Sequence, residues 1–203
     1  MTTRTQQPTR RMKPTALGLI VLGMLLEEPM HVYRMQKLIK ERGKDKVVNV
    51  RQRTSLHQVI DRLTTHGLVE QAGTDRDSSE NYPGRRVYRI TAVGRRAAVD
   101  WLTEMVTELP EEFPQFPAAL SVLTMVDEDT AADLIAARIE TLESTVRDAR
   151  AADAGYDIPR VYLLEDEYRT RSLAAEAGWL TEVLQDIRGG RLSWTTPTKE
   201  TTP

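Results

Sequence analysis

The residues best suited to chemistry lie between Thr54 and Thr65, where polar side chains alternate with apolar ones at helical spacing. Leu56, Ile60 and Leu63 would face inward on such a helix. The outer and flanking faces would then carry hydroxyl, imidazole, amide, carboxylate and guanidinium groups: Ser55, His57, Gln58, Asp61, Arg62 and Thr65. Most of these groups can donate hydrogen bonds to phosphate oxygens and base edges, which is the chemistry of nucleic-acid recognition.

Arginines bracket this segment. Arg51 and Arg53 precede it, where the N–H groups and the dipole of a helix start favour phosphate. Arg85 and Arg86 follow at the tip of an expected hairpin, next to Tyr88. A single surface arginine is usually only solvated, but four around one amphipathic helix and one hairpin favour a polyanionic partner.

The charge is divided unevenly along the chain. The net charge is −2, yet residues 1–110 hold 19 lysines and arginines against 12 acidic residues, and residues 111–203 hold 9 against 18. A basic half joined to an acidic half predicts a polyanionic partner for the first half and a different kind of partner for the second.

Other chemistries find little support. There is no cysteine, and the three histidines are scattered without the short spacing of metal ligands. The run Glu165-Asp166-Glu167 points around a helix instead of converging, so a solvated face is favoured over acid/base or metal chemistry. No nucleophile motif or phosphate loop occurs, so we expect neither an enzyme nor a bound metal or cofactor.

The elements that position these groups follow from periodicity and from helix breakers. The helices expected in the first half are Thr15–Glu27, His31–Arg42, Thr54 or Ser55 to His66, and Ala92–Glu108. A β-like run is expected at Val47–Val50, with strands starting at Leu68 and spanning Arg86–Thr91. The fourth helix would turn five side chains inward: Val93, Ala97, Trp101, Leu102 and Met105.

Beyond a proline-rich boundary at 110–117 the pattern is helical, over Ala118–Val126, Asp127–Asp153 and Arg160–Arg188. We therefore predict a mainly α fold with a small β-hairpin. A winged helix-turn-helix at 13–110 would be followed by an antiparallel helical domain at 111–190, with disordered tails at 1–12 and 191–203. The apolar run Ala16–Leu26 is too short to span a bilayer and lacks a cleavage site, so we expect a cytoplasmic protein.

Three motifs resemble the PadR family of transcriptional regulators. Pro29-Met30-His31-Val32-Tyr33 is similar to the start of that family's second helix. The segment 54–63, followed by Gly67-Leu68-Val69, resembles its recognition helix, and 84–91 followed by Gly94-Arg95 resembles its second wing strand and fourth helix. The acidic half is similar to the larger PadR subfamily in length and pattern only.

The chain departs from the family at two places. Val32 stands where the family usually has glycine, and His57-Gln58 stand where it usually has Tyr-Pro. The family's tyrosine commonly reaches a DNA phosphate, and a protonated histidine would make the same contact more strongly. Predicted DNA-binding residues are Arg51, Arg53, Thr54, Ser55, His57, Gln58, Arg62, Arg85, Arg86 and Tyr33.

The resemblance further implies a repressor that binds an inverted-repeat operator on double-stranded DNA and is released by an aromatic or hydrophobic effector. Trp101, Met105 and Trp179 are candidate effector contacts, although a place in the core or in a dimer interface is favoured for them. Apolar stripes along both long C-terminal helices predict a homodimer, because a lone helical pair would leave much of them exposed. The alternatives are an effector-independent architectural or protein-binding module and, with no supporting motif, a helical enzyme.

Overall fold

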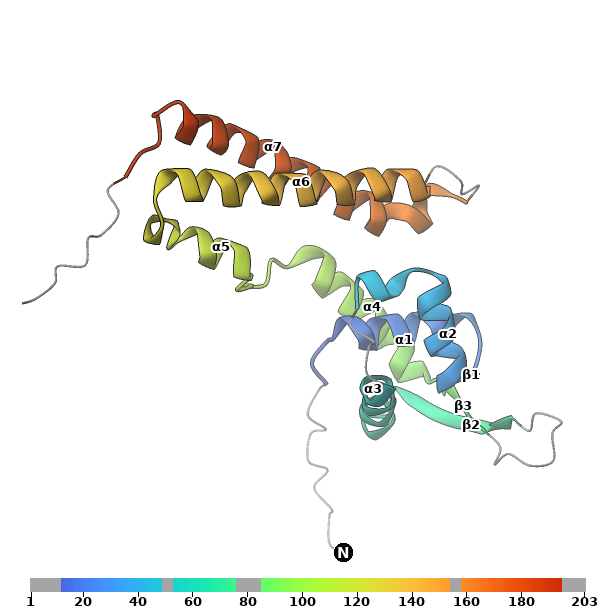
Figure 1. The fold of residues 1–203 in the computed structure, drawn as a ribbon. Helices are drawn as coiled ribbons and strands as arrows, with labels where there is room; N and C mark the ends of the chain where they lie inside the picture. Colours follow the sequence, from blue (N-terminus) through green and yellow to red (C-terminus); the bar gives the residue numbers. More distant parts are fainter. Residues whose placement is uncertain (1–11, 49–52, 76–84, 154–157, 195–203) are drawn as a thin grey trace, which may run out of the picture. The chain divides into compact units, whose positions relative to one another are not determined.

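The computed structural model describes residues 12–48, 53–75, 85–153 and 158–194 of the chain (Figure 1). It divides into two compact units, residues 1–110 and 111–203. Both are mainly helical, and a small antiparallel sheet belongs to the first. The predicted fold class, a winged helix-turn-helix followed by a helical region, is confirmed.

The first unit follows the predicted order, with helices closed at the expected residues. Its elements are α1 (Ala16–Glu27), β1 (Met30–His31), α2 (Val32–Glu41), the 3-10 helix η1 (Lys44–Lys46), α3 (Arg53–Thr65), β2 (Val69–Asp75), β3 (Arg85–Ile90) and α4 (Ala92–Thr107). Gly43 and Gly67 follow α2 and α3 with φ of 65° and 68°, a left-handed conformation that glycine adopts without steric cost.

The core of this unit lies among α1, α2, α3, the sheet and α4. Its largest fully buried side chains include Trp101, Leu22, Met35 and Ile60. The Trp101 ring lies beside Gly18, where an added Cβ would stand 3.0 Å from a ring carbon, so the glycine makes room for α4 on α1. Burial of this apolar surface is the main force that holds α3 in place.

The sheet has the strand order β1-β3-β2, and both pairings are antiparallel. β2 and β3 form the predicted wing hairpin, with a register shift between Gln71 and Gly73. β1 was not predicted: Met30 and His31 pair with Tyr88 and Val87, so the segment before α2 is a strand as well as a helix start. The second helix therefore begins at Val32, with His31 as its cap.

The second unit is built on two long helices. Its elements are α5 (Gln115–Leu120), η2 (Leu123–Met125), α6 (Glu128–Asp153), η3 (Arg160–Leu163) and α7 (Leu164–Arg188). α6 and α7 pack along each other as an antiparallel pair, with Ile135, Leu142, Leu180 and Ile187 buried between them (Figure 1). Arg138 links three helices, since it bonds Glu176 of α7 through Nε at 2.7 Å and lies 3.4 Å over the Phe116 ring of α5.

Several expectations about the elements were wrong. Val47 is helical in backbone and Val48 is buried in a bend, so no strand forms at the described part of that run. α3 begins at Arg53, so Thr54 and Ser55 lie inside the helix and neither is its cap. α5 begins at Gln115, because Pro117 fits the first turn of a helix, where its missing N–H costs nothing.

Burial corrected other expectations. Val93, Leu102 and Met105 are 49%, 53% and 38% exposed, because α4 meets its own core only along the face of Ala98 and Trp101. Most of the apolar stripe expected to require a second copy is already buried between α6 and α7, while Leu134 is 57% exposed.

The ends of the two units extend further than predicted. Met12, assigned to the N-terminal tail, is buried in the first core. Trp194 lies within the predicted C-terminal tail, yet it packs on the second unit. Its indole Nε1–H donates to the Val126 carbonyl at 2.9 Å, and its backbone N–H donates to Glu128. An indole buries apolar area and satisfies its one donor in the same step, so this contact competes well with solvation.

Candidate nucleic-acid interface

The helix α3 presents a polar face because its apolar stripe is fully used in the core. Leu56, Ile60 and Leu63 are 3%, 1% and 0% exposed. Val59 is also buried, whereas His57, Gln58, Asp61 and Arg62 are exposed. His57 and Asp61 are four residues apart, so they lie on the same face of successive turns.

The start of α2 adds a second group of side chains. The His31 ring nitrogen Nδ1 accepts a hydrogen bond from the Arg34 backbone N–H at 3.0 Å, which caps the helix. The ring of Tyr33 lies 6.2 Å from the His31 ring and is 55% exposed. His31 thus caps the start of α2, and its ring lies beside the ring of Tyr33.

The wing strand β3 supplies the third group. Successive side chains of a strand point to opposite faces, so Arg86 and Tyr88 lie on one face and Arg89 on the other. Arg89 donates through Nε to Glu70 of β2 at 2.7 Å. Within the described part of the chain Arg86 forms no ion pair, and its side chain is exposed. The two arginines of one strand therefore have different environments.

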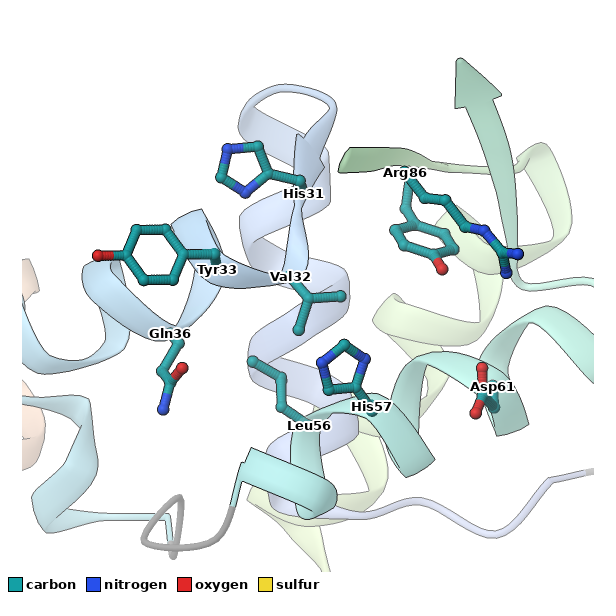
Figure 2. Close-up of a pocket in the computed structure, with 9 residues that line it drawn as sticks. His31, Val32, Tyr33, Gln36, Leu56, His57, Asp61 and Arg86 are labelled. Carbon is teal, nitrogen blue, oxygen red and sulfur yellow. The ribbon is translucent and has the colours of Figure 1, made fainter. Parts of the chain in front are cut away.

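These three groups line one groove of about 530 Å³ (Figure 2). Its walls come from β1, α2, α3 and β3. They consist of His31, Val32, Tyr33, Gln36, Leu56, His57, Asp61, Arg86 and Tyr88. The lining combines imidazole, phenol, amide, carboxylate and guanidinium groups on a partly apolar floor, so it can donate to and accept from an extended polar partner.

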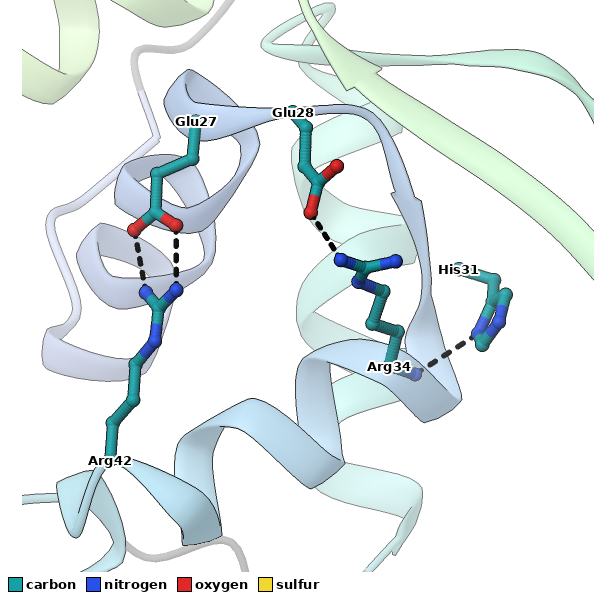
Figure 3. A network of polar contacts seen from close by, with 5 residues as sticks. All are labelled: Glu27, Glu28, His31, Arg34 and Arg42. Carbon is teal, nitrogen blue, oxygen red and sulfur yellow. Dashed lines mark hydrogen bonds and ion pairs between the residues drawn. The ribbon is translucent and has the colours of Figure 1, made fainter.

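Ion pairs divide the arginines of the first unit into two kinds. Arg42 holds Glu27 with two hydrogen bonds of 2.6 and 2.7 Å, and Arg34 holds Glu28 (Figure 3). The hydrogen bonds from Arg42 lower the pKa of Glu27, and those to Glu27 raise the pKa of Arg42. These arginines tie α2 to the end of α1 and are already neutralised.

Arg62 differs, since it is exposed and forms no ion pair with any residue that the structure describes. Among the described residues, Arg62 and Arg86 are thus two guanidinium groups at or beside the groove that are not held in ion pairs. Phosphate is the ligand that such guanidinium groups bind in a bidentate manner.

The structure brings together some of the predicted DNA-binding residues. Tyr33, His57 and Arg86 line the groove, and Gln58 and Arg62 are exposed on α3 beside it. Ser55 is only partly exposed. Arg53 and Thr54 lie in the first turn of α3 and Arg85 begins β3, whereas Arg51 lies outside the described residues.

Six lining residues were not among the predicted site residues: His31, Val32, Gln36, Leu56, Asp61 and Tyr88. Asp61 had been placed on the exposed face of the helix without a role, although its spacing from His57 already put the two together. Val32 and Gln36 come from α2, and no local pattern indicates that this helix faces β3.

The candidate effector residues are distributed over both units. Trp101 is 1% exposed in the first core, whereas Met105 and Trp179 are 38% and 48% exposed. A ligand therefore has access to Met105 and Trp179 in the single chain, but Trp101 is covered. His66 also has a structural position, since its Nδ1 lies 2.8 Å from the Arg62 carbonyl at the end of α3.

Two absences concern the described residues alone. They hold no group of three or more histidine or acidic side chains arranged to bind a metal ion. They also hold no helix that is both long enough and apolar enough to cross a bilayer.

The chain resembles known proteins in sequence and in structure. Residues 21–100 match the model of the Transcriptional regulator PadR-like family. A search among curated proteins gave no match.

Three solved structures share the fold at low identity. Bacillus subtilis PadR in complex with operator DNA is 16% identical with a TM-score of 0.69, over 85% of this chain and 99% of that one. The same protein in complex with p-coumaric acid is 16% identical with a TM-score of 0.67, over 86% and 99%. The Vibrio cholerae virulence activator AphA is 18% identical with a TM-score of 0.64, also over 86% and 99%.

The family match covers all of α2, α3, the described wing strands and the first half of α4, and these elements build the groove. The likeness to solved regulators extends through the helical unit. Residues 21–100 are therefore similar to the PadR-like family of transcriptional regulators, and the chain shares the fold of solved PadR structures.

Proposed function

We propose that the protein binds double-stranded DNA in a sequence-specific manner, with α3 in the major groove and the β2–β3 wing along the phosphate backbone. One observation carries this proposal: His57 of α3 shares a single groove with Arg86 of β3, which forms no ion pair with a described residue. This is the placement that a winged helix needs for base and phosphate contacts at the same time. The similarity to a PadR structure with operator DNA supports it.

We further propose that the protein acts as a cytoplasmic homodimer on an inverted repeat. The second unit keeps large apolar side chains exposed after α6 and α7 have packed, among them Met125 at 73%, Tyr168 at 75% and Trp179 at 48%. Burial against a second copy would remove them from water. Two recognition helices would then meet half-sites about 34 Å apart, one helical turn of DNA.

Control by a small molecule is the finer part of the proposal. A repressor released by an aromatic or hydrophobic effector accords with the PadR structure that holds p-coumaric acid. Met105 and Trp179 are accessible to such a ligand, and Trp101 would have to be uncovered first. The competing function is an effector-independent architectural or protein-binding module, and its acidic second unit would then bind a protein.

The test is binding to the DNA upstream of the protein's own gene, titrated across salt concentrations and repeated with fragments selected from the whole genome. One protected inverted repeat, with affinity that falls steeply with salt, is the expected result. Binding that ignores sequence in both sets of DNA would refute a specific regulator. If aromatic acids abolish operator binding and aliphatic acids leave it unchanged, the result would support the effector-controlled function over the effector-independent module.

Arg86 and Arg89 form a matched pair for the same titration. Arg86→Ala is expected to weaken binding about equally on all sequences and to reduce the salt slope by roughly one unit, since one phosphate contact is lost. Arg89→Ala, on the same strand but paired with Glu70 on its other face, should leave the slope unchanged. Equal slopes for both variants would show that Arg86 does not contact phosphate.

A further inference from the structure

We infer that Asp61 selects a cytosine at one position of each DNA half-site. The inference rests on the DNA-binding function proposed above and assigns a base to one residue of that surface. Asp61 projects from α3 in the same groove as His57 and Arg86 (Figure 2). It is therefore on the face of the helix that would enter the major groove, one turn after His57.

The Asp61 side chain makes no stabilising polar contact with the described residues. Its carboxylate forms no ion pair or hydrogen bond there, although arginines lie on both neighbouring elements. Four other acidic side chains of this unit are paired: Glu27 with Arg42, Glu28 with Arg34, Glu41 with Lys37 and Glu70 with Arg89. Asp61 is exposed, and no described residue uses its carboxylate oxygens as acceptors.

A carboxylate on this face is unfavourable for binding to DNA in general. It adds negative charge to a surface whose other charges, Arg62 and Arg86, suit phosphate, so it weakens contact with any sequence. Only a base that offers a hydrogen-bond donor compensates for that repulsion.

In the major groove, cytosine presents its N4 amino group as a donor, and carboxylates accept from it. Adenine also presents an amino group, but its neighbouring N7 is an acceptor that a carboxylate cannot satisfy. Guanine and thymine offer acceptors at these edges, which would face the carboxylate without a donor. Asp61 would therefore favour cytosine at this position over the other three bases.

The experiment is a selection of bound sequences from random DNA by the full-length wild type, Asp61→Ala, Asp61→Asn and Glu108→Ala. The last is a charge control, because Glu108 is exposed at the end of α4 and outside the groove. Wild type should prefer cytosine roughly tenfold at one position of each half-site. Asp61→Ala should lose that preference while binding unrelated DNA more tightly. Asp61→Asn should shift the preference to adenine, which asparagine contacts through N6 and N7.

Three results would overturn the inference. The first is an Asp61→Ala variant that selects the wild-type sequence with undiminished preference, since Asp61 would then be only a repulsive charge. The second is an Asp61→Ala variant that binds all sequences more weakly and with a reduced salt slope, since Asp61 would then act by positioning Arg86. The third is a Glu108→Ala variant that changes the same base preference. If the wild type itself selects no sequence, the proposed function fails instead.

Discussion

Replacing Gly94 by alanine should destabilise the first unit, because no space exists for the added methyl group. An ideal Cβ at this position would lie 2.9 Å from both the Leu68 carbonyl carbon and Ile90 Cγ1, and it would overlap the Leu68 carbonyl oxygen. That oxygen accepts hydrogen bonds from the Thr91 backbone N–H at 3.0 Å and from the Thr91 hydroxyl at 3.2 Å. The backbone between α3 and β2 would have to move.

The magnitude follows from three effects. Overpacking of a core costs about 1–3 kcal/mol, and the upper end applies because backbone atoms are struck. Disturbing the hydrogen bonds to Leu68 adds roughly 1 kcal/mol. The better helix propensity of alanine returns about 1 kcal/mol. We expect a net loss of about 3 kcal/mol, and a melting temperature lower by roughly 10 °C or more for a unit of this size.

The assay is urea unfolding followed by the fluorescence of Trp101, in a background where Trp179 and Trp194 are phenylalanine. Gly23→Ala is the matched control, since Gly23 lies inside α1 with nothing within 4 Å of an added Cβ. It should be neutral or stabilise the unit by up to about 1 kcal/mol. Surface substitutions usually change the free energy of unfolding by no more than about 0.5 kcal/mol. A Gly94→Ala variant whose free energy of unfolding lies that close to its parent's would refute the tight packing between α4 and the start of β2.

Three further predictions concern the helical unit. The pKa of Asp127 is lowered because its carboxylate accepts the Thr130 backbone N–H, so its contribution to stability is present above the ordinary aspartate pKa and is lost as pH falls through the lowered one. Asp127→Asn keeps a good cap and should flatten this acid-side loss in thermal melts followed by circular dichroism. Trp194→Phe removes the donor to the Val126 carbonyl and should cost about 1 kcal/mol, seen as faster amide exchange at the start of α6, and unchanged exchange would show that the contact is not held. Arg138→Lys keeps the charge but loses the planar contact with the phenylalanine ring of α5, and a loss of about 1 kcal/mol is expected in urea unfolding, whereas no loss would exclude a stabilising contact.

Local patterns were sufficient for the elements that carry the groove. The stripe of Leu56, Ile60 and Leu63 predicted both the existence of α3 and its exposed face, because helical periodicity is a property of the segment itself. The glycines at 43 and 67 marked the ends of α2 and α3 for a similarly local reason. The polar residues that line the α3 side of the groove were therefore predictable.

Pairing between distant segments was not predictable in the same way. β1 has only two residues, and its partner strand lies more than fifty positions later, so no alternation indicates it. Leu102 and Met105 continue the apolar stripe of α4 beyond the core that it meets, and the sequence does not say where that core ends. Trp194 stands in a polar segment, and its acceptors, Val126 and Glu128 at the start of α6, come close to it only in the folded chain.

The pairing of β1 with β3 has a mechanical consequence for the groove. His31 is at once a residue of the sheet and the cap of α2, so the wing and the second helix share a rigid joint. The wing cannot swing away from α2 without breaking backbone hydrogen bonds and uncapping the helix. The spacing between the backbone at Arg86 and the backbone at Tyr33 is thus fixed by the fold. Under the proposed function, the protein would offer these two contacts to DNA at a constant separation.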